Sequence, residues 1–332
     1  MLKLLIMRRV FLCLIIFFWL GLGQAYPYWI WTPKSGKWVN PKNMPKPTPK
    51  EQFEYAQGFY EIKQYDDAKR EFQKLLKAYG KTAEAAESQY YLGRIEEDRD
   101  NLYSAYLEYQ KVIDKYPFSD RIQEIIEREY KIAEAFMQGE KRKAMGITLP
   151  VENPSIEIFN KVIENSTYGP YAPKAQYKLG LVLKGLLRYY EAEEAFGKVI
   201  SNYPTSEWAE PSKFQIASCR AGLSRGPEYD QGAADEAKQK FEDFVRDHPD
   251  AVLSAEAEKS IALIKDKEAQ SSYNIAVFYE KQKAYQAAKI YYQEAIDNYP
   301  NTDWAAKAAE KLQELEKLLE KQAEKKNAKK KK

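Results

Sequence analysis

Between Tyr273 and Pro300 the sequence reads YNIAVFYEKQKAYQAAKIYYQEAIDNYP, and its spacing decides the fold. The small residue Ala276 is followed twelve residues later by Ala288, and Tyr292 and Pro300 come four and twelve residues after that alanine. This spacing predicts two antiparallel helices, because small residues let two backbones approach closely while an aromatic side chain fills the groove between them. Pro300 would then end the second helix, since proline lacks the N–H group that continues it.

The same pattern recurs along most of the chain. A small residue and an alanine lie twelve apart in four unbroken copies, Ala56 with Ala68, Gly93 with Ala105, Gly180 with Ala192 and Ala276 with Ala288. Two more copies, from Ala133 to Ser155 and from Ala217 to Ala237, are stretched by connections that contain glycine and proline. We therefore predict an all-α fold over residues 50–315, a right-handed superhelical solenoid of about six helix pairs with two protruding loops.

Residues 1–25 predict a signal peptide. Arg8 and Arg9 precede the apolar run Val10–Leu22, and Gly23-Gln24-Ala25 supplies small residues for cleavage. The run is shorter than the roughly 20 residues that span a bilayer, which favours cleavage over retention as an anchor and leaves both open. Export through such a leader predicts a periplasmic protein.

Cysteine and charge set further bounds. Cys13 follows Leu12 and so lacks the small preceding residue that lipid attachment needs, and Cys219 is the only other cysteine. Once the leader is removed, no intrachain disulfide is possible. The 52 basic and 49 acidic residues become 49 and 49 without Lys3 and the two leader arginines. A basic nucleic-acid-binding face is therefore not expected.

Two short segments flank the predicted solenoid. Residues 26–49 predict an aromatic hairpin and a proline-rich linker, in which Trp29 and Trp31 share one face before a turn at residues 33–36. This hairpin would either cap the exposed end of the first repeat or present an aromatic patch to a partner or glycan. Residues 316–332 predict a lysine-rich tail, which would be either a solvated end or a contact with anionic lipid or an acidic partner.

The spacing of small, alanine, aromatic and proline positions resembles the tetratricopeptide repeat over nearly all of the mature chain. Three features further resemble the BamD family of outer-membrane assembly factors. They are the Tyr-Pro-x-Ser/Thr tail at Tyr116, Tyr203 and Tyr299, the Trp-Ala openings at Trp208 and Trp304, and the stretch of residues 273–300.

The resemblance to BamD implies a periplasmic protein-binding scaffold in outer-membrane β-barrel assembly, associated with the outer membrane. Its partners would be β-barrel assembly components and unfolded outer-membrane proteins. The Tol-Pal-associated coordinators of envelope constriction have similar repeats and a similar export signal. Such a coordinator is therefore the alternative function.

One position is aromatic in all six predicted pairs, three residues before the small residue. These residues form what we call the aromatic stripe: Phe53, Tyr90, Tyr130, Tyr177, Phe214 and Tyr273. In tetratricopeptide repeats this side of the first helix faces the concave groove, so the resemblance implies that the stripe binds partner segments. The helical spacing also fits rings that pack between successive repeats, and both interpretations stay open.

No catalytic or cofactor chemistry is predicted. His248 is the only histidine, and the sequence contains no glycine-rich phosphate loop and no metal-ligand cluster. Glu87-Ser88 is similar to the start of a signature of peptidoglycan lytic enzymes, but the glycine-rich part that should follow is missing. We therefore predict a protein that is not an enzyme and needs no cofactor or metal, with a lytic enzyme as the remote alternative.

Overall fold

The computed structural model describes residues 29–32, 36–40, 44–144, 147–148, 153–224 and 231–330. The predicted signal peptide of residues 1–25 lies outside the described residues, as do residues 33–35 of the predicted hairpin turn and parts of both stretched connections. The chain divides into two compact units, Met1–Ile122 and Gln123–Lys332, which are described separately.

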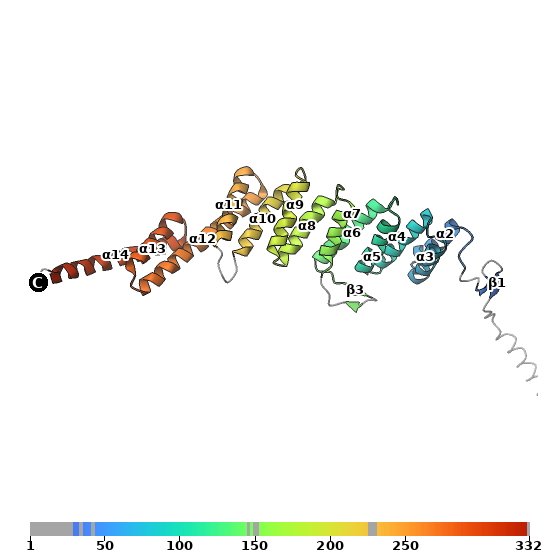
Figure 1. The fold of residues 1–332 in the computed structure, drawn as a ribbon, viewed down its shortest axis with the longest axis horizontal. Coiled ribbons are helices and arrows are strands. Elements are labelled where there is room, and N and C mark those ends of the chain that lie inside the picture. Colours follow the sequence, from blue (N-terminus) through green and yellow to red (C-terminus); the bar gives the residue numbers. More distant parts are fainter. Residues whose placement is uncertain are drawn as a thin grey trace, which may run out of the picture. The chain divides into compact units, whose positions relative to one another are not determined.

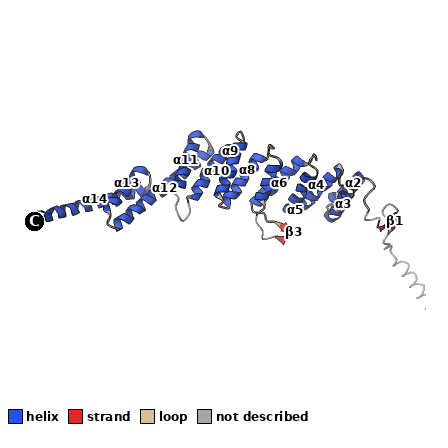
Figure 2. Cartoon of the chain, in the orientation of Figure 1, coloured by secondary structure: helices blue, strands red, loops and turns tan. Residues whose placement is uncertain are grey.

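The first unit contains two helix pairs and a small hairpin (Figure 1). The helix α2 (Pro49–Glu61) packs on α3 (Tyr65–Tyr79), and α4 (Ala83–Asp98) packs on α5 (Leu102–Lys115). Ahead of them lie two short strands, drawn in red in Figure 2, β1 (Ile30–Thr32) and β2 (Lys37–Val39). They pair antiparallel, with Trp31 opposite Trp38. The predicted N-terminal aromatic hairpin is therefore confirmed.

The second unit continues the series of antiparallel pairs. Its helices are α6 (Ile122–Met137, whose first residue ends the first unit), α7 (Ser155–Asn165), α8 (Ala172–Gly185), α9 (Tyr189–Asn202), α10 (Ala209–Leu223), α11 (Gln231–Asp247), α12 (Val252–Lys281), α13 (Tyr285–Asn298) and α14 (Asp303–Lys330). A short hairpin of β3 (Lys143–Ala144) and β4 (Ile147–Thr148), which the sequence did not predict, lies between α6 and α7. The described residues thus confirm the predicted all-α solenoid of six tetratricopeptide-like pairs.

The core lies between the two helices of each pair, as the spacing predicts. The four alanines of the unbroken copies, Ala68, Ala105, Ala192 and Ala288, are fully buried. In all six pairs the aromatic residue of the second helix is also buried, with at most 1% of its surface exposed. These residues are Phe72, Tyr109, Phe159, Phe196, Phe241 and Tyr292. The repeated small and aromatic positions are therefore the contact between paired helices.

The turns inside four pairs share an unusual backbone conformation. Each contains one non-glycine residue with φ between 58° and 61°: Lys63, Asp100, Leu187 and Lys283. In the first of these turns, the amide of Gln64 donates to the carbonyl of Phe59 at 2.9 Å, which closes the preceding helix in a Schellman-type arrangement. Because this conformation costs a non-glycine residue roughly 1–2 kcal/mol, the packing of the pair must impose it.

Two helices extend beyond a single repeat. The helix α12 has 30 residues; Ala257 and Ile264 belong to the core with α10 and α11, and Ala276 belongs to the core with α13 and α14. The helix α14 continues to Lys330, so it includes most of the segment predicted as a tail. None of the helices in the described part of the chain combines the length and the hydropathy that crossing a membrane requires.

Candidate protein-interaction surface

The aromatic stripe lies inside the helix pairs. Each of its six residues contacts the aromatic residue on the second helix of its own pair, with ring centroids 5.5–5.9 Å apart. Four of these residues are buried, with 2–8% of their surface exposed: Tyr90, Tyr130, Tyr177 and Phe214. Phe53 and Tyr273, which belong to the first and the last pair, are partly buried.

The stripe also contacts residues at the start of the following pair. Such contacts, with ring centroids 5.0–5.3 Å apart, join Tyr130 with Tyr171 and Tyr177 with Trp208, and Tyr273 of the last pair makes an equivalent contact at 5.4 Å with Trp304 of the final helix α14. In the first unit the guanidinium of Arg121 lies 4.8 Å from the centre of the Tyr90 ring. The rings therefore pack between successive pairs. That the stripe also binds partners stays a prediction, and it depends on the groups beside the rings.

Beside Tyr90, the surface of α4 is polar and its groups bond to one another. Arg94 donates from Nη1 to the Tyr90 hydroxyl at 3.1 Å, and its Nη2 lies 4.0 Å from Oδ1 of Asp98. The Tyr60 hydroxyl donates to the same carboxylate at 2.7 Å. Burial and this hydrogen bond raise the pKa of Tyr60, so its hydroxyl stays protonated. This surface offers a partner polar groups in fixed positions.

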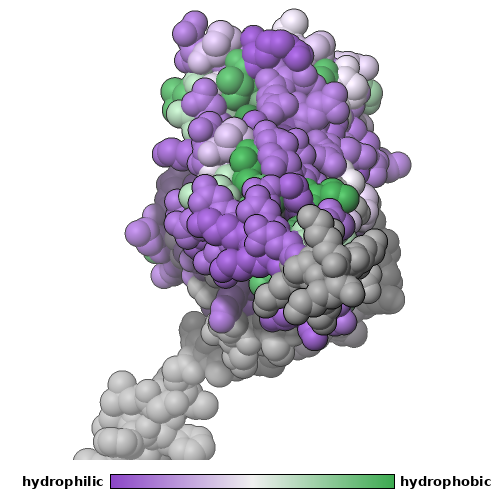
Figure 3. All heavy atoms as spheres, turned by 90° about the vertical axis from the view of Figure 1, so that its left-hand side faces the viewer, coloured by the Kyte–Doolittle hydropathy of each residue, from purple (hydrophilic) through white to green (hydrophobic). Residues whose placement is uncertain are grey.

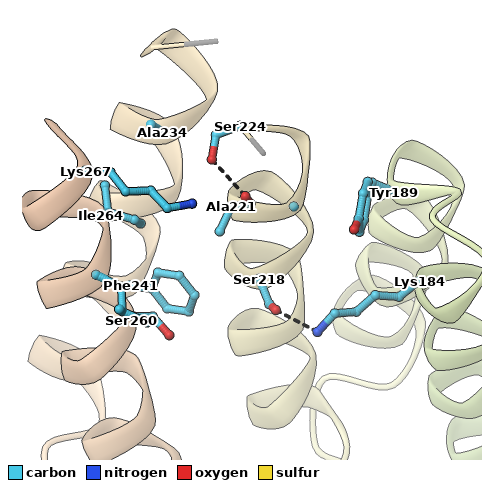
Figure 4. A pocket seen from close by; sticks show the side chains of 12 residues that line it. Lys184, Tyr189, Ser218, Ala221, Ser224, Ala234, Phe241, Ser260, Ile264 and Lys267 are labelled. Atoms are coloured by element: carbon cyan, nitrogen blue, oxygen red, sulfur yellow. Dashed lines mark hydrogen bonds between the residues drawn. The ribbon is translucent and has the colours of Figure 1, made fainter. Parts of the chain in front are cut away.

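The corresponding face of α10 carries small side chains. At one, four and five positions after the small residue of the repeat, α4 has Arg94, Glu97 and Asp98, whereas α10 has Ser218, Ala221 and Gly222. A cavity of about 360 Å³ lies over these three residues (Figure 4). We call this cavity the α10 hollow.

Apolar side chains from three helices form the walls of the α10 hollow. Tyr189 comes from α9, Phe241 from α11, and Leu263 and Ile264 from α12. Phe241 and Ile264 are buried, whereas Leu263 is 61% exposed, so the hollow is open to solvent at α12. Ligand cavities in proteins span about 300–1,000 Å³, which makes this hollow large enough for one or two bulky side chains.

Two lysines lie on opposite sides of the α10 hollow (Figure 4). Lys184 of α8 donates from Nζ to Oε1 of Gln215 at 2.7 Å and to Oγ of Ser218 at 2.6 Å, which fixes its position. Lys267 of α12 is exposed, and its ammonium group points toward the hollow. Since the described residues that line the hollow include no acidic side chain, its charge is positive.

Cys219 follows Ser218 but does not take part in the surface. Its side chain is fully buried, and burial raises the pKa of its thiol to about 11. The thiol is therefore protonated at neutral pH and packs as a small apolar group.

The α10 hollow was not among the predicted sites. The sequence does contain a signal for it, because Ser218, Ala221 and Gly222 are small where the equivalent positions of α4 carry long or charged side chains. This difference becomes visible only when the repeats are aligned with one another. In Figure 3, which faces the side where the C-terminus lies in Figure 1, hydrophilic residues predominate and hydrophobic ones form separate spots.

Helix pairs that repeat the same small residue, the same aromatic residue and the same turn define a tetratricopeptide-repeat protein. A tetratricopeptide repeat family model matches residues 55–120. A second family model, described as outer membrane lipoprotein YfiO, matches residues 156–331, which is more than half of the chain. The chain belongs to this family of outer membrane lipoproteins, and the resemblance to BamD is thereby confirmed.

Solved structures of repeat proteins are also similar to the chain. The C-terminal part of a TPR repeat-containing protein from Cytophaga hutchinsonii is 18% identical, with 79% of this chain and 88% of that chain covered and a TM-score of 0.36. A tetratricopeptide repeat protein from Parabacteroides merdae is 16% identical, with 81% and 98% covered and a TM-score of 0.34. A comparison with curated proteins found no match.

Proposed function

We propose that this protein is a periplasmic, BamD-like scaffold that binds extended protein segments during outer-membrane β-barrel assembly. The observation that carries the proposal is the α10 hollow, an apolar cavity flanked by two lysines inside the region that matches the outer membrane lipoprotein family. The helices α8, α10 and α12 all contribute residues to its lining, and a partner segment would lie across them.

A bulky apolar side chain of the partner would enter the hollow. Burying an exposed leucine or phenylalanine side chain contributes about 1.5–3 kcal/mol, which changes the affinity by a factor of about ten to a hundred. Lys184 and Lys267 would attract acidic groups that flank this side chain. Unfolded strands of outer-membrane barrels suit such a site, since they carry an apolar side chain at every second residue.

Filling the hollow tests the proposal. In the double variant Ser218→Leu/Ala221→Leu, two partly exposed residues gain side chains that occupy the cavity. We expect its affinity for an unfolded outer-membrane protein, measured by fluorescence anisotropy, to be at least about tenfold weaker. The matched control is Ala255→Leu, an exposed position of α12 outside the hollow, which should bind like the original protein. Equal binding by the filled variant would contradict the proposal.

Affinity capture from envelope extracts distinguishes the proposal from the alternatives. Recovery of β-barrel assembly components supports it, and recovery of Tol-Pal components in their place supports the coordinator of envelope constriction. Turnover of purified peptidoglycan would support the lytic enzyme. The contacts of Glu87 speak against that last alternative, because its Oε1 accepts a hydrogen bond from Nε of Arg121 at 3.0 Å and its Oε2 lies 3.0 Å from Nη2.

A further inference from the structure

The N-terminal hairpin exposes three tryptophans on one face. Trp31 and Trp38 lie directly opposite each other in the strand register, and Trp29 precedes Trp31 by two residues. Cross-strand partners and alternate residues share a face of a β-hairpin, so the three rings form one aromatic surface. Their exposed fractions are 55% for Trp29, 49% for Trp31 and 65% for Trp38. A cap buried against the first helix pair would leave much less of these rings exposed.

The segment around this aromatic surface is strongly basic. Residues 26–50 contain five lysines and no acidic residue. Residues 51–320, which hold the helix pairs, contain 37 basic and 48 acidic residues. Positive charge is therefore concentrated beside the tryptophans and in the lysine-rich tail, whereas the repeats carry a net negative charge. A binding partner for the hairpin should be both apolar and anionic.

The connector between the hairpin and the helices is fixed at Lys46. Its backbone amide donates to Oε1 of Gln52 at 2.8 Å, and its carbonyl accepts a hydrogen bond from the Tyr79 hydroxyl at 2.6 Å. The ammonium group of Lys46 lies 4.1 Å from the centre of the Tyr55 ring. Only six residues separate Val39, the end of β2, from Lys46, so a surface that binds the hairpin would also hold the first helix pair close to it.

We propose that this hairpin binds the interface of an anionic phospholipid bilayer, with Trp29, Trp31 and Trp38 at the level of the lipid headgroups. Tryptophan prefers this interface because it combines a large apolar ring with a polar N–H group. Each lysine near an anionic bilayer surface strengthens binding by about fivefold. The same surface repels the acidic repeats, which therefore stay in the aqueous phase and available to protein partners.

Tryptophan fluorescence tests the proposal in the full chain. The reporter variant Trp19→Phe/Trp208→Phe/Trp304→Phe keeps only the three hairpin tryptophans, so its emission reports on the hairpin whether or not the leader is present. With phosphatidylglycerol vesicles we expect the emission to shift to shorter wavelength and brominated lipids to quench it. Phosphatidylcholine vesicles and added salt should reduce both effects. An emission spectrum that does not change with anionic vesicles would overturn the proposal.

A second variant measures how much the rings contribute. We expect Trp29→Ser/Trp31→Ser/Trp38→Ser to bind anionic vesicles at least about tenfold more weakly than the original chain in co-sedimentation, with an unchanged helical circular dichroism spectrum. The matched control is Trp208→Phe/Trp304→Phe, since these two rings pack on Tyr177 and Tyr273. Equal binding by the serine variant and the control would overturn the proposal. So would a reporter that responds only to envelope proteins.

Discussion

Gly93 lies so close to the buried ring of Tyr109 that a Cβ atom added at residue 93 would be 2.4 Å from Cε1 of that ring. The same relationship recurs between Gly180 and Phe196, where the shortest distance would be 2.6 Å. Real Cβ atoms do not approach a ring this closely. The small position of the repeat is therefore required by the aromatic residue of the facing helix, not by a need for flexibility.

Two glycines of the first unit should respond to alanine in opposite directions. We expect Gly93→Ala to lower the free energy of unfolding by about 1–3 kcal/mol, because the Tyr109 ring has no exposed surface toward which it can move. Gly58 lies inside α2 with nothing within 4 Å of an added Cβ. Gly58→Ala should therefore raise the free energy of unfolding by up to about 1 kcal/mol through helix propensity. Urea unfolding of both variants checks the signs.

Tyr90 provides a test of what the aromatic stripe does. Its ring is 2% exposed, so we expect Tyr90→Ala to lower the free energy of unfolding by about 3–5 kcal/mol. Tyr90→Phe keeps the ring and removes only the hydroxyl that accepts from Arg94, which should cost about 1 kcal/mol. If Tyr90→Ala kept its stability and lost partner binding, the stripe would be a binding surface in its own right.

The ion pair between Lys238 and Glu268 predicts a pH-dependent variant. Nζ of Lys238 lies 3.0 Å from Oε1 of Glu268, whose side chain is 2% exposed. Burial raises the pKa of Glu268, and the ammonium group opposes this effect. Lys238→Met would leave the carboxylate buried and without this cation, which should cost about 3 kcal/mol at pH 7.

The stability that Lys238→Met loses relative to the original protein should become smaller as the pH falls. Because the pKa of Glu268 is raised in the folded state, the folded protein takes up the proton more readily than the unfolded chain, and acid favours folding of this variant. The matched control is Lys265→Met, which removes an exposed pair with Glu242 and should cost less than about 1 kcal/mol at either pH. If unfolding curves gave the same loss of unfolding free energy for Lys238→Met at pH 7 and at pH 5, this account would be contradicted.

Cys219 should be unreactive until the protein unfolds. Its thiol is fully buried with a pKa raised to about 11, so we expect alkylation at pH 8 to be at least about a hundredfold slower in the native protein than in guanidinium chloride. The denatured chain also reports on the leader, because Cys13 is the only other cysteine. One reactive thiol per chain indicates cleavage, and two indicate retention.

The helix pairs could be predicted because their spacing follows directly from packing geometry. A side chain at position 93 would clash with Tyr109, so the need for a small residue there is visible in the residue types themselves. The turns could not be predicted in the same way. Lys63 and Leu187 adopt φ of 58° and 61°, which no propensity of lysine or leucine favours. Contacts between whole helices select that conformation.

The candidate site was less accessible to prediction for a similar reason. The aromatic stripe is uniform in the sequence because its rings pack within and between pairs, and uniformity alone does not distinguish packing from binding. The α10 hollow arises because Ser218, Ala221 and Gly222 have small side chains, and because the neighbouring helices α9, α11 and α12 form walls around them. An absent side chain produces a cavity only when the surrounding helices leave the space empty.

The long helix α12 connects the α10 hollow with the last hydrophobic core of the second unit. Leu263, at the wall of the α10 hollow, and Ala276, in the core formed with α13 and α14, belong to one uninterrupted helix. At 1.5 Å per residue they are roughly 20 Å apart along its axis. Because α12 is one uninterrupted helix, it fixes where α13 and α14 lie relative to the α10 hollow.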